Sequence, residues 1–446
     1  MAERRSLGAN YRKVYVASIV SNLGDGVSQI GYPWLASAVT RNPILIAMVA
    51  VAQRLPWLVF TLPAGVITDR VDRRKAMIVM DTCRAVLTGA VALAVLGLGR
   101  SLPDVHHLAG VHGTRAGLYV VLVLSSLLLG FAEVLRDNSA QTIIPSIVGD
   151  DDLERANGRM WSAETVANTF GGPPLGSLLL AVAFALPFLV DAGSFAVAAG
   201  LVFLVTGQFR AAHIDSTVKA EAGAWKQELR EGVTWLWHHP LLRPMAIILG
   251  IMNALGALQQ ATLVLYAQEV LKTSPIEFAI LMMGGAVGGV LGGYIAPAVR
   301  NRIGSGPSLW LTLGVGAIVP FVVGLTSTWE VVLAVSAVEA LTAVLWNVIT
   351  VSLRQAIIPD ALLGRVNSVY RFFAWGMIPI GTALGGIAVA VTQPHLGRET
   401  ALRVPWFVAA ACAFALIFYA VPKLTTEKMD AARAAATSEP RPTPTP

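Results

Sequence analysis

Long apolar runs recur along the whole chain, and few charged side chains interrupt them. Many of these runs are about 20 residues long, which is the length that a helix needs to span a bilayer. Of the 446 residues, 55% are hydrophobic and 13% are charged. A soluble domain carries roughly twice that charged fraction. The sequence therefore predicts an all-α membrane protein that crosses the bilayer many times.

Apolar spans and polar gaps alternate regularly. We expect twelve transmembrane helices, at residues 14–39, 44–67, 76–99, 117–141, 158–182, 185–206, 241–270, 276–298, 308–327, 330–353, 366–391 and 403–421. The longest gap, 207–240, is polar. Its stretch WKQELREGVTWLWHH places four apolar residues on one face, which are Trp225, Leu229, Val233 and Leu236. That pattern predicts an amphipathic helix on the membrane surface. The tail at 423–446 ends in SEPRPTPTP, a composition typical of disorder.

Lysine and arginine are distributed unevenly between the two sides of these spans. If the N-terminus is cytoplasmic, the basic residues of the external loops are Arg41, Arg100, Arg115, Lys272, Arg398 and Arg403. Most other basic loop residues are then cytoplasmic, so the positive-inside rule places both ends of the chain in the cytoplasm. The same rule accounts for the net charge of +6 better than a nucleic-acid partner would.

Several function classes lack their usual sequence signals. Cys83 and Cys412 both fall within apolar segments, so they form neither a disulfide framework nor a metal cluster. No Gly-Lys pair exists, which excludes the usual phosphate-binding loop of an ATP-driven pump. No nucleophile–base constellation or metal-ligand spacing is visible. We therefore expect neither an enzyme nor a cofactor.

An internal repeat divides the chain into two halves. The stretch QTIIP at 141–145 returns as QAIIP at 355–359, and an Arg-x-Asn sequence follows each copy. Each copy joins the fourth and fifth spans of its half, so we expect pseudo-symmetric six-helix halves at 1–206 and 241–422, joined by 207–240. Repeated halves with a site near the midplane are typical of secondary transporters. A channel is less favoured, because no glycine-rich re-entrant segment is present.

The loop after the second span reads GVITDRVDRRK and resembles a signature of the major facilitator superfamily. The matching residues are Gly65, Asp69, Arg70, Arg73 and Arg74. The match departs at Asp72, where glycine is common, and the second half has Pro297 where Asp69 would fall. The resemblance implies this family's fold and a one-sided cytoplasmic latch between the halves. Positive-inside anchoring explains the arginines, but not Asp69 or Gly65.

The fifth span carries a second motif, in the stretch NTFGGPPLGS. Gly172, Pro173 and Gly176 resemble the antiporter signature of exporters in this superfamily, although Ser177 and Asn168 replace glycines of the usual pattern. Small residues permit close helix contact, and proline bends the helix. The resemblance implies export, whereas generic glycine and proline packing is the simpler interpretation.

The fourth span ends in a polar face formed by Glu133, Asp137 and Gln141, which are four residues apart. With the stretches DRVDRR, LERANG and VDAGSF, residues 10–420 look like the drug:H+ antiporter branch that contains macrolide and enterobactin exporters. Another superfamily signature has an arginine in the middle of this span. Here that stretch is YVVLVLSSLLLG, so the role of that arginine must be absent or relocated.

Ionisable residues at membrane depth are the main functional candidates, because burying a charge there is costly. They are Asp25, Arg54, Arg84, Glu133, Asp191 and Glu339. For Arg84, a structural pair or snorkelling toward the interface is the simpler interpretation. For Asp191, a satisfied cap or a packing role is simpler.

Asp25 and Arg54 are predicted to form an ion pair. At 1.5 Å per residue, Asp25 lies about 16 Å from the cytoplasmic start of its span and Arg54 about 20 Å from the cytoplasmic end of its span. A conformational change that makes and breaks the pair would release and bind a proton. The alternative is a static pair that fixes packing. Glu133 and Glu339 are second candidates for carrying the proton or binding a cationic substrate.

A substrate cavity is expected to be mostly apolar and aromatic, with a few polar groups. The candidates are Gln29, Trp34, Asp137, Asn253, Gln259, Trp346, Asn347, Tyr370 and Trp375. For each aromatic residue, packing or interfacial anchoring is the competing interpretation.

We therefore expect a monomeric, proton-driven exporter of lipophilic, drug-like or siderophore-like small molecules in the inner (plasma) membrane. Its expected partners are that small molecule, protons and the lipid bilayer. The alternatives are a lipid or lysolipid flippase, a solute importer on the same fold, and a receptor or scaffold that transports nothing. Buried charge in both halves argues against the last.

Overall fold

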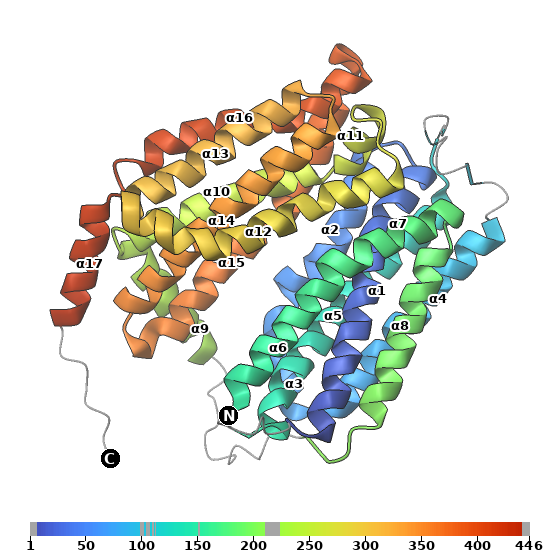
Figure 1. Cartoon of the computed structure of the whole chain (residues 1–446), viewed down its shortest axis with the longest axis horizontal. Coiled ribbons are helices and arrows are strands. Elements are labelled where there is room, and N and C mark those ends of the chain that lie inside the picture. Colours follow the sequence, from blue (N-terminus) through green and yellow to red (C-terminus); the bar gives the residue numbers. More distant parts are fainter. Residues whose placement is uncertain are drawn as a thin grey trace. The chain divides into compact units, whose positions relative to one another are not determined.

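The computed structural model is helical throughout most of its described length (Figure 1). The structure describes residues 7–98, 102–103, 108, 111, 113–149, 152–209 and 224–438. Within these ranges, β-type pairing is confined to one isolated bridge, between Thr40 and Thr114. The all-α architecture predicted from the apolar runs is confirmed.

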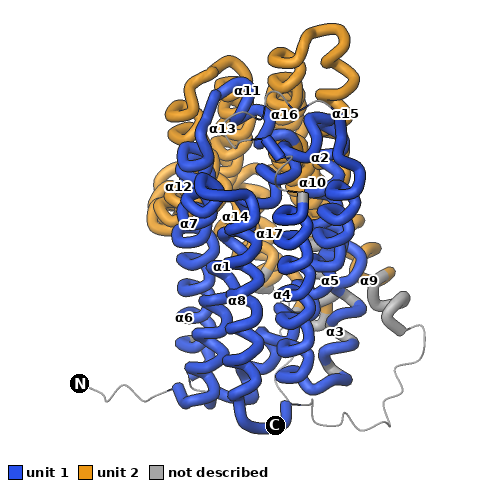
Figure 2. The backbone as a smooth tube through the Cα atoms, turned by 90° about the vertical axis from the view of Figure 1, so that its right-hand side faces the viewer, with its two compact units in different colours: residues 1–216, 262–283 blue, residues 217–261, 284–446 orange. Residues whose placement is uncertain are grey.

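The chain forms two compact units (Figure 2). The first contains residues 1–216 and 262–283, and the second contains residues 217–261 and 284–446. The predicted halves follow the sequence repeat alone, so they assign 262–283 to the second half. The structure assigns this segment to the first unit.

Polar contacts hold the 262–283 segment in the first unit. The Arg41 guanidinium forms a salt bridge with Glu269 and donates a hydrogen bond of 2.6 Å to the Gln268 side chain. Gln268 in turn donates to the Ser37 hydroxyl at 2.9 Å. These contacts connect the end of the first long helix to a segment more than 220 residues later in the chain.

The helices of the first unit pack around its N-terminal helix. They are α1 (Ala9–Val39), α2 (Pro43–Val59), α3 (Thr61–Arg70), α4 (Arg73–Leu98), α5 (Ala116–Ile147), α6 (Leu153–Thr165), the π-helical η4 (Val166–Gly171), α7 (Gly172–Val182), α8 (Leu186–Phe203) and α11 (Leu263–Glu269). α1 contacts α5, α7 and α8, while α4 contacts α5 and α8.

The second unit contains most of α12, which begins in the first unit. Its helices are α9 (Ala224–His238), α10 (Leu242–Gln260), α12 (Pro275–Ile303), α13 (Ser305–Leu325), α14 (Trp329–Ile357), α15 (Asp360–Leu396), α16 (Arg398–Ala420) and α17 (Thr426–Ser438). Close contacts join α10 to α15 and α13 to α14 and α16.

Nine helices of the described chain are long and apolar enough to cross a membrane. They are α4, α5, α8, α10, α12, α13, α14, α15 and α16. Three expected spans fall outside this set, and each carries a feature singled out in the sequence. α1 contains Asp25, α2–α3 leads into the basic loop, and α6–η4–α7 contains the Gly172 motif.

Prolines explain the break in the fifth expected span. Pro173 and Pro174 have no backbone N–H, so they cannot donate the helical hydrogen bonds to the carbonyls of Thr169 and Phe170. The chain forms η4 immediately before them, and α7 then begins at Gly172. Such π-helical insertions are common at functional sites.

The C-terminal segment differs from the sequence expectation. The 423–446 tail was expected to be disordered, but residues Thr426–Ser438 form α17. Met429 is fully buried in the core of the second unit, and Trp310 donates a 2.8 Å hydrogen bond to the Leu424 carbonyl. Tertiary burial therefore overrides the polar composition of this segment.

The linker helix is present as α9, where the sequence predicts an amphipathic helix. Part of its apolar face packs against α15 and α10 instead of facing the membrane surface. Leu236 is only 1% exposed and belongs to the core of the second unit.

Candidate functional site

Asp25 of α1 forms an ion pair with Arg84 of α4. The two side chains approach to 2.5 Å, and Arg84 also donates a 3.1 Å hydrogen bond to Ser21. The guanidinium carbon of Arg84 lies 3.8 Å from the centre of the Phe195 ring, a cation–π geometry. The Arg84 side chain is 3% exposed, whereas that of Asp25 is 28% exposed.

The predicted partner of Asp25 is therefore wrong. Arg54 lies on α2 and is exposed, while Arg84, for which a structural pair or snorkelling was the simpler interpretation, binds Asp25. The depth estimate fixed positions along the membrane normal only. It carried no information about which faces of α1, α2 and α4 point toward each other.

The ion pair continues into a longer chain of alternating charges. Arg84 lies 3.4 Å from Asp81, and Arg136 of α5 lies 3.5 Å from the same Asp81 oxygen. Arg136 also pairs with Asp137 at 3.3 Å and donates to the Ser18 hydroxyl at 3.2 Å. The order Asp25–Arg84–Asp81–Arg136–Asp137 joins α1, α4 and α5, and we call it the ion-pair chain.

Two members of the ion-pair chain were missed as site candidates. Asp81 is fully buried and Arg136 is 2% exposed. Both lie nearer the predicted cytoplasmic end of their spans than the middle of the membrane. A signal for Asp81 was available, because Asp81 and Arg84 are three residues apart on one face of an apolar helix. For Arg136, the adjacent acids Glu133 and Asp137 were the only hint.

Glu133 lies in the electrostatic field of the same site. Its carboxylate interacts with the charges of Asp25, Asp137, Arg84 and Arg54. The structure therefore places Glu133 and Arg54 near the ion-pair chain, although Arg54 is not the partner of Asp25.

Asp191 of α8 is a second buried carboxylate beside α1. It is 2% exposed, and the Ser28 hydroxyl donates a hydrogen bond to one of its oxygens. A Cβ atom on Gly24 would lie 2.4 Å from its other oxygen. Glycine at position 24 thus makes room for a carboxylate next to Asp25.

Helix α7 meets α1 directly beside Asp25. A Cβ atom on Gly172 would lie 2.4 Å from the Gly26 Cα, and one on Gly176 would lie 2.5 Å from the Val27 carbonyl oxygen. The glycines of the exporter-like motif therefore let α7 touch the backbone of α1 one residue after Asp25. Pro173 follows at the start of α7.

The second unit repeats this packing without the charge. A Cβ atom on Gly381 of α15 would lie 2.1 Å from the Ala254 carbonyl oxygen of α10. The residue before Ala254 is Asn253, which donates a 2.7 Å hydrogen bond to the Ala374 carbonyl. Asn253 therefore lies one residue before a close glycine contact, as Asp25 does, and it carries a neutral amide.

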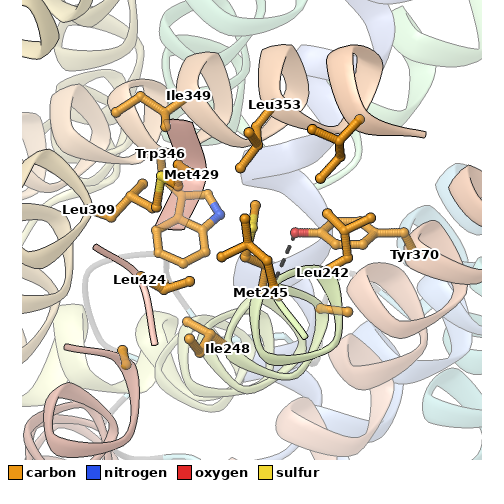
Figure 3. Packing of buried hydrophobic residues seen from close by; sticks show 14 of the residues in the cluster. Leu242, Met245, Ile248, Leu309, Trp346, Ile349, Leu353, Tyr370, Leu424 and Met429 are labelled. Carbon is orange, nitrogen blue, oxygen red and sulfur yellow. Dashed lines mark hydrogen bonds between the residues drawn. The ribbon is translucent and has the colours of Figure 1, made fainter. Parts of the chain in front are cut away.

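Two predicted cavity residues lie in the hydrophobic core of the second unit (Figure 3). Trp346 is 2% exposed and packs near Leu309 and Met429. Tyr370 is 1% exposed and donates a 3.4 Å hydrogen bond to the Met245 carbonyl. In this structure both side chains pack in the core, and their role in a substrate cavity stays a prediction.

The other cavity candidates have varied environments. In the first unit, Trp34 is buried and packs edge-on against Phe278, and Gln29 is exposed and donates a hydrogen bond to Asn168. In the second unit, Gln259 is buried, while Asn347 and Trp375 are exposed.

Glu339 of α14 is half-buried in the second unit. Among the described residues it forms no ion pair, and only its backbone carbonyl accepts a side-chain hydrogen bond, from Thr342. It remains a separate candidate carboxylate.

The basic loop binds helix ends within the first unit. Arg73 donates a 3.0 Å hydrogen bond to the Thr142 carbonyl near the end of α5, and Arg74 donates a 2.6 Å bond to the Phe203 carbonyl at the end of α8. Positive charge is favourable at helix C-termini. Arg70 is exposed, and the surroundings of Gly65 and the side chain of Asp69 lie outside the described part of the structure.

Asp72 explains the departure from the family pattern. One of its oxygens accepts a 3.1 Å hydrogen bond from the Lys75 N–H, which caps α4. The other accepts a 3.2 Å bond from the Phe209 N–H, so Asp72 joins α4 to the segment after α8.

Known proteins resemble this chain along nearly its whole length. A family profile described as transmembrane secretion effector matches residues 8–441. The multidrug efflux pump Tap of Mycolicibacterium fortuitum is 27% identical over 384 residues, which cover 84% of this chain and 87% of that protein. The enterobactin exporter EntS of Citrobacter koseri is 23% identical over 390 residues, which cover 86% of each protein.

A solved structure shows the same fold. A bacterial homologue of the iron transporter ferroportin, in an inward-facing state, aligns with a TM-score of 0.69 and 16% identity, covering 94% of this chain and 100% of that one. Because the family match extends from residue 8 to residue 441, this protein belongs to the transmembrane secretion effector family of the major facilitator superfamily, a family of multi-pass membrane transporters and not of enzymes.

Proposed function

We propose that this transporter is a proton-coupled antiporter that exports lipophilic small molecules by alternating access. The observation that carries the proposal is the Asp25–Arg84 ion pair, beside the glycine contact between α1 and α7. A carboxylate at membrane depth that is partly exposed can exchange a proton, and its neutralisation removes its attraction for the guanidinium.

The packing gives proton exchange a mechanical consequence. Gly26 follows Asp25 directly, and its backbone touches the backbone of Gly172. If α1 shifts when the ion pair is lost, α1 must therefore push against α7. Backbone contacts this close cannot be compressed, so the two helices respond together.

Export is favoured over import by the motif of α7 and by the names of the relatives. Tap is a multidrug efflux pump and EntS is an enterobactin exporter. We propose a drug-like or siderophore-like substrate for this chain, twelve membrane crossings, two cytoplasmic termini, a location in the plasma membrane and a monomeric state. The crossings are the nine apolar helices together with α1, α2–α3 and α6–η4–α7.

Uptake of a fluorescent dye into inverted membrane vesicles tests the proposal. With ethidium as the probe, we expect accumulation in energised vesicles and its loss when a proton uncoupler is added. Asp25→Asn should reduce accumulation to the uncoupled level, because the neutral amide cannot exchange a proton. Asp430→Asn is the control, because Asp430 is an exposed residue of α17 with only a weak ion pair, 3.7 Å from Arg433.

Two results would contradict the proposal. Accumulation that the uncoupler leaves unchanged would exclude proton coupling, and wild-type uptake in Asp25→Asn would exclude Asp25 as the coupling residue. If a panel of dyes and macrolides gives no uptake, a fluorescent lysolipid assayed in the same vesicles tests the flippase alternative.

A further inference from the structure

Arg84 lies between two carboxylates and is bound unequally to them. Its Nη2 atom is 2.5 Å from an Asp25 oxygen, whereas its Nη1 atom is 3.4 Å from Asp81 Oδ1. The contact with Asp25 is a charge-assisted hydrogen bond, and the contact with Asp81 is looser. In this structure, the guanidinium is therefore held mainly by Asp25.

Asp81 has binding capacity that the structure leaves unused. Its side chain is fully buried, and both Arg84 and Arg136 approach the same oxygen, Oδ1. Among the described residues, Oδ2 has no hydrogen-bond partner. A buried carboxylate oxygen without a partner is unfavourable, and a planar guanidinium can satisfy both oxygens of one carboxylate at once.

The two carboxylates differ in their access to protons. The Asp25 side chain is 28% exposed, and that of Asp81 is not exposed at all. A proton from water therefore reaches Asp25 more readily than Asp81. Protonation cancels the negative charge of Asp25 and leaves Arg84 with Asp81 as its adjacent anionic partner.

We propose that Asp81 is a positioning residue for proton coupling, which receives the Arg84 guanidinium when Asp25 binds a proton. The inference rests on the proposed function only in assigning proton exchange to Asp25. The proton enters from water at the Asp25 carboxylate, Arg84 moves to Asp81, and the reverse movement restores the Asp25–Arg84 pair when the proton leaves. The bound proton raises the net charge of the ion-pair chain by one, and each arginine keeps an acidic partner throughout.

Other charged groups face the same region and define the competing outcomes. They are Arg54 on α2, Glu133, Arg136 and Asp137 on α5, Glu164 on α6 and Asp191 on α8. Glu133 is the main competitor as an acceptor, because it interacts with both Asp25 and Arg84. No other residue considered combines full burial, contact with Arg84 and a carboxylate oxygen without a partner.

A structure of Asp25→Asn tests the movement directly, since asparagine mimics the protonated acid. We expect both Nη atoms of Arg84 to bind both oxygens of Asp81, at about 2.7–2.9 Å. Arg84 remaining beside residue 25, or turning to Glu133, would overturn the proposal. This test needs no substrate, and it does not depend on whether a variant of Asp81 folds.

An infrared pH titration tests the energetic role of Asp81 in the purified protein reconstituted in liposomes. The signal of protonated carboxyl groups that disappears in Asp25→Asn identifies the Asp25 titration. In Asp81→Asn, Arg84 has lost its second acceptor, so protonating Asp25 becomes harder. We expect the midpoint to move toward acid by roughly one to three pH units.

Two comparison variants distinguish the movement of Arg84 to Asp81 from the general effect of removing a buried charge or a buried polar group. Asp137→Asn removes the same charge from the other end of the ion-pair chain, so it should shift the midpoint by less than Asp81→Asn does. Thr88→Val alters another fully buried polar residue of α4, seven positions along the helix, and should leave the midpoint unchanged. Equal shifts in Asp81→Asn and Asp137→Asn would overturn the proposal, as would an unchanged midpoint in Asp81→Asn. The vesicle assay can also show no proton coupling while the titration midpoint of Asp25 still shifts as expected in Asp81→Asn. In that case the proposed function fails, and the movement of Arg84 from Asp25 to Asp81 is still supported.

Discussion

At the scale of single residues, the site is defined by charges whose partners lie on other helices. Asp25 was recognised from its depth alone, because a carboxylate in an apolar span is costly. Its partner was not, because Arg84 reaches it from α4. Asp81 is fully buried, so its role becomes visible only when both arginines are seen to approach it.

Asp72 makes a specific contribution to stability. We expect Asp72→Ala to lower the free energy of unfolding by about 0.5–2 kcal/mol, because the cap of α4 and the bond to the Phe209 N–H are both lost. Thermal unfolding of the purified protein in detergent measures this change.

Asp152→Ala is the matched control for Asp72. Asp152 precedes α6 in the same way, but its side chain makes no capping hydrogen bond. It forms a surface ion pair with Arg155, a kind of contact worth little. Equal losses of stability in the two variants would show that Asp72 does not act as a cap.

At the scale of helices, glycine contacts set which faces meet. The Gly172 motif was recognised in the sequence, and the structure shows that it packs on Gly26 and Val27. The second unit has a similar close contact, between Gly381 and Ala254. Helix α12 has a second face of glycines, which packs closely on α14. Its members are Gly284, Gly288 and Gly292.

Neighbouring glycines of α12 provide a sharp test of this packing. A Cβ atom on Gly288 would lie 1.9 Å from the Ala337 carbonyl oxygen, whereas one on Gly289 would meet nothing within 4 Å. We expect Gly288→Ala to separate α12 from α14 and to destabilise the protein by about 1–3 kcal/mol.

Gly289→Ala should be neutral or slightly stabilising, because alanine is the better helix former. Thermal unfolding of both variants, with the wild type alongside, distinguishes them. If both variants unfold at the wild-type temperature, close approach at Gly288 is not required for stability.

At the scale of the whole molecule, the structural units do not follow the sequence repeat. Residues 262–283 come after α10 in the chain but fold with the first unit. The Arg41–Glu269 salt bridge lies there, with side chains that are 14% and 18% exposed. Arg41 was counted in the sequence only as one of the basic residues of the external loops.

A double-mutant cycle measures what this salt bridge contributes. We expect Arg41→Gln and Glu269→Gln each to lower the unfolding temperature, and the double variant to lose less stability than the two single losses added together. The coupling free energy should be about 0.5–3 kcal/mol, because the pair is partly buried and Arg41 also binds Gln268.

Strict additivity in this cycle would indicate that Arg41 and Glu269 act independently. Repeating the cycle at high salt provides a control, because a screened surface pair would lose its coupling and a buried one would keep most of it.

The sequence by itself determined that this protein is helical, which superfamily it belongs to and which buried charges are functional candidates. Apolar runs of membrane length required helices, and the motifs at Gly65–Arg74 and Gly172–Gly176 identified the superfamily. The cost of burying a charge marked Asp25 and Glu133 as functional candidates. Each of these inferences uses periodicity, spacing or burial cost, which are properties of a local stretch of chain.

Only the tertiary structure decided which groups meet. It paired Asp25 with Arg84 instead of Arg54, placed Trp346 and Tyr370 in a core, and folded α17 against the second unit. The physical reason is that depth along a helix leaves its rotation and its neighbours undetermined. A side chain's environment depends on both, and they are settled by packing between helices that are distant in the sequence.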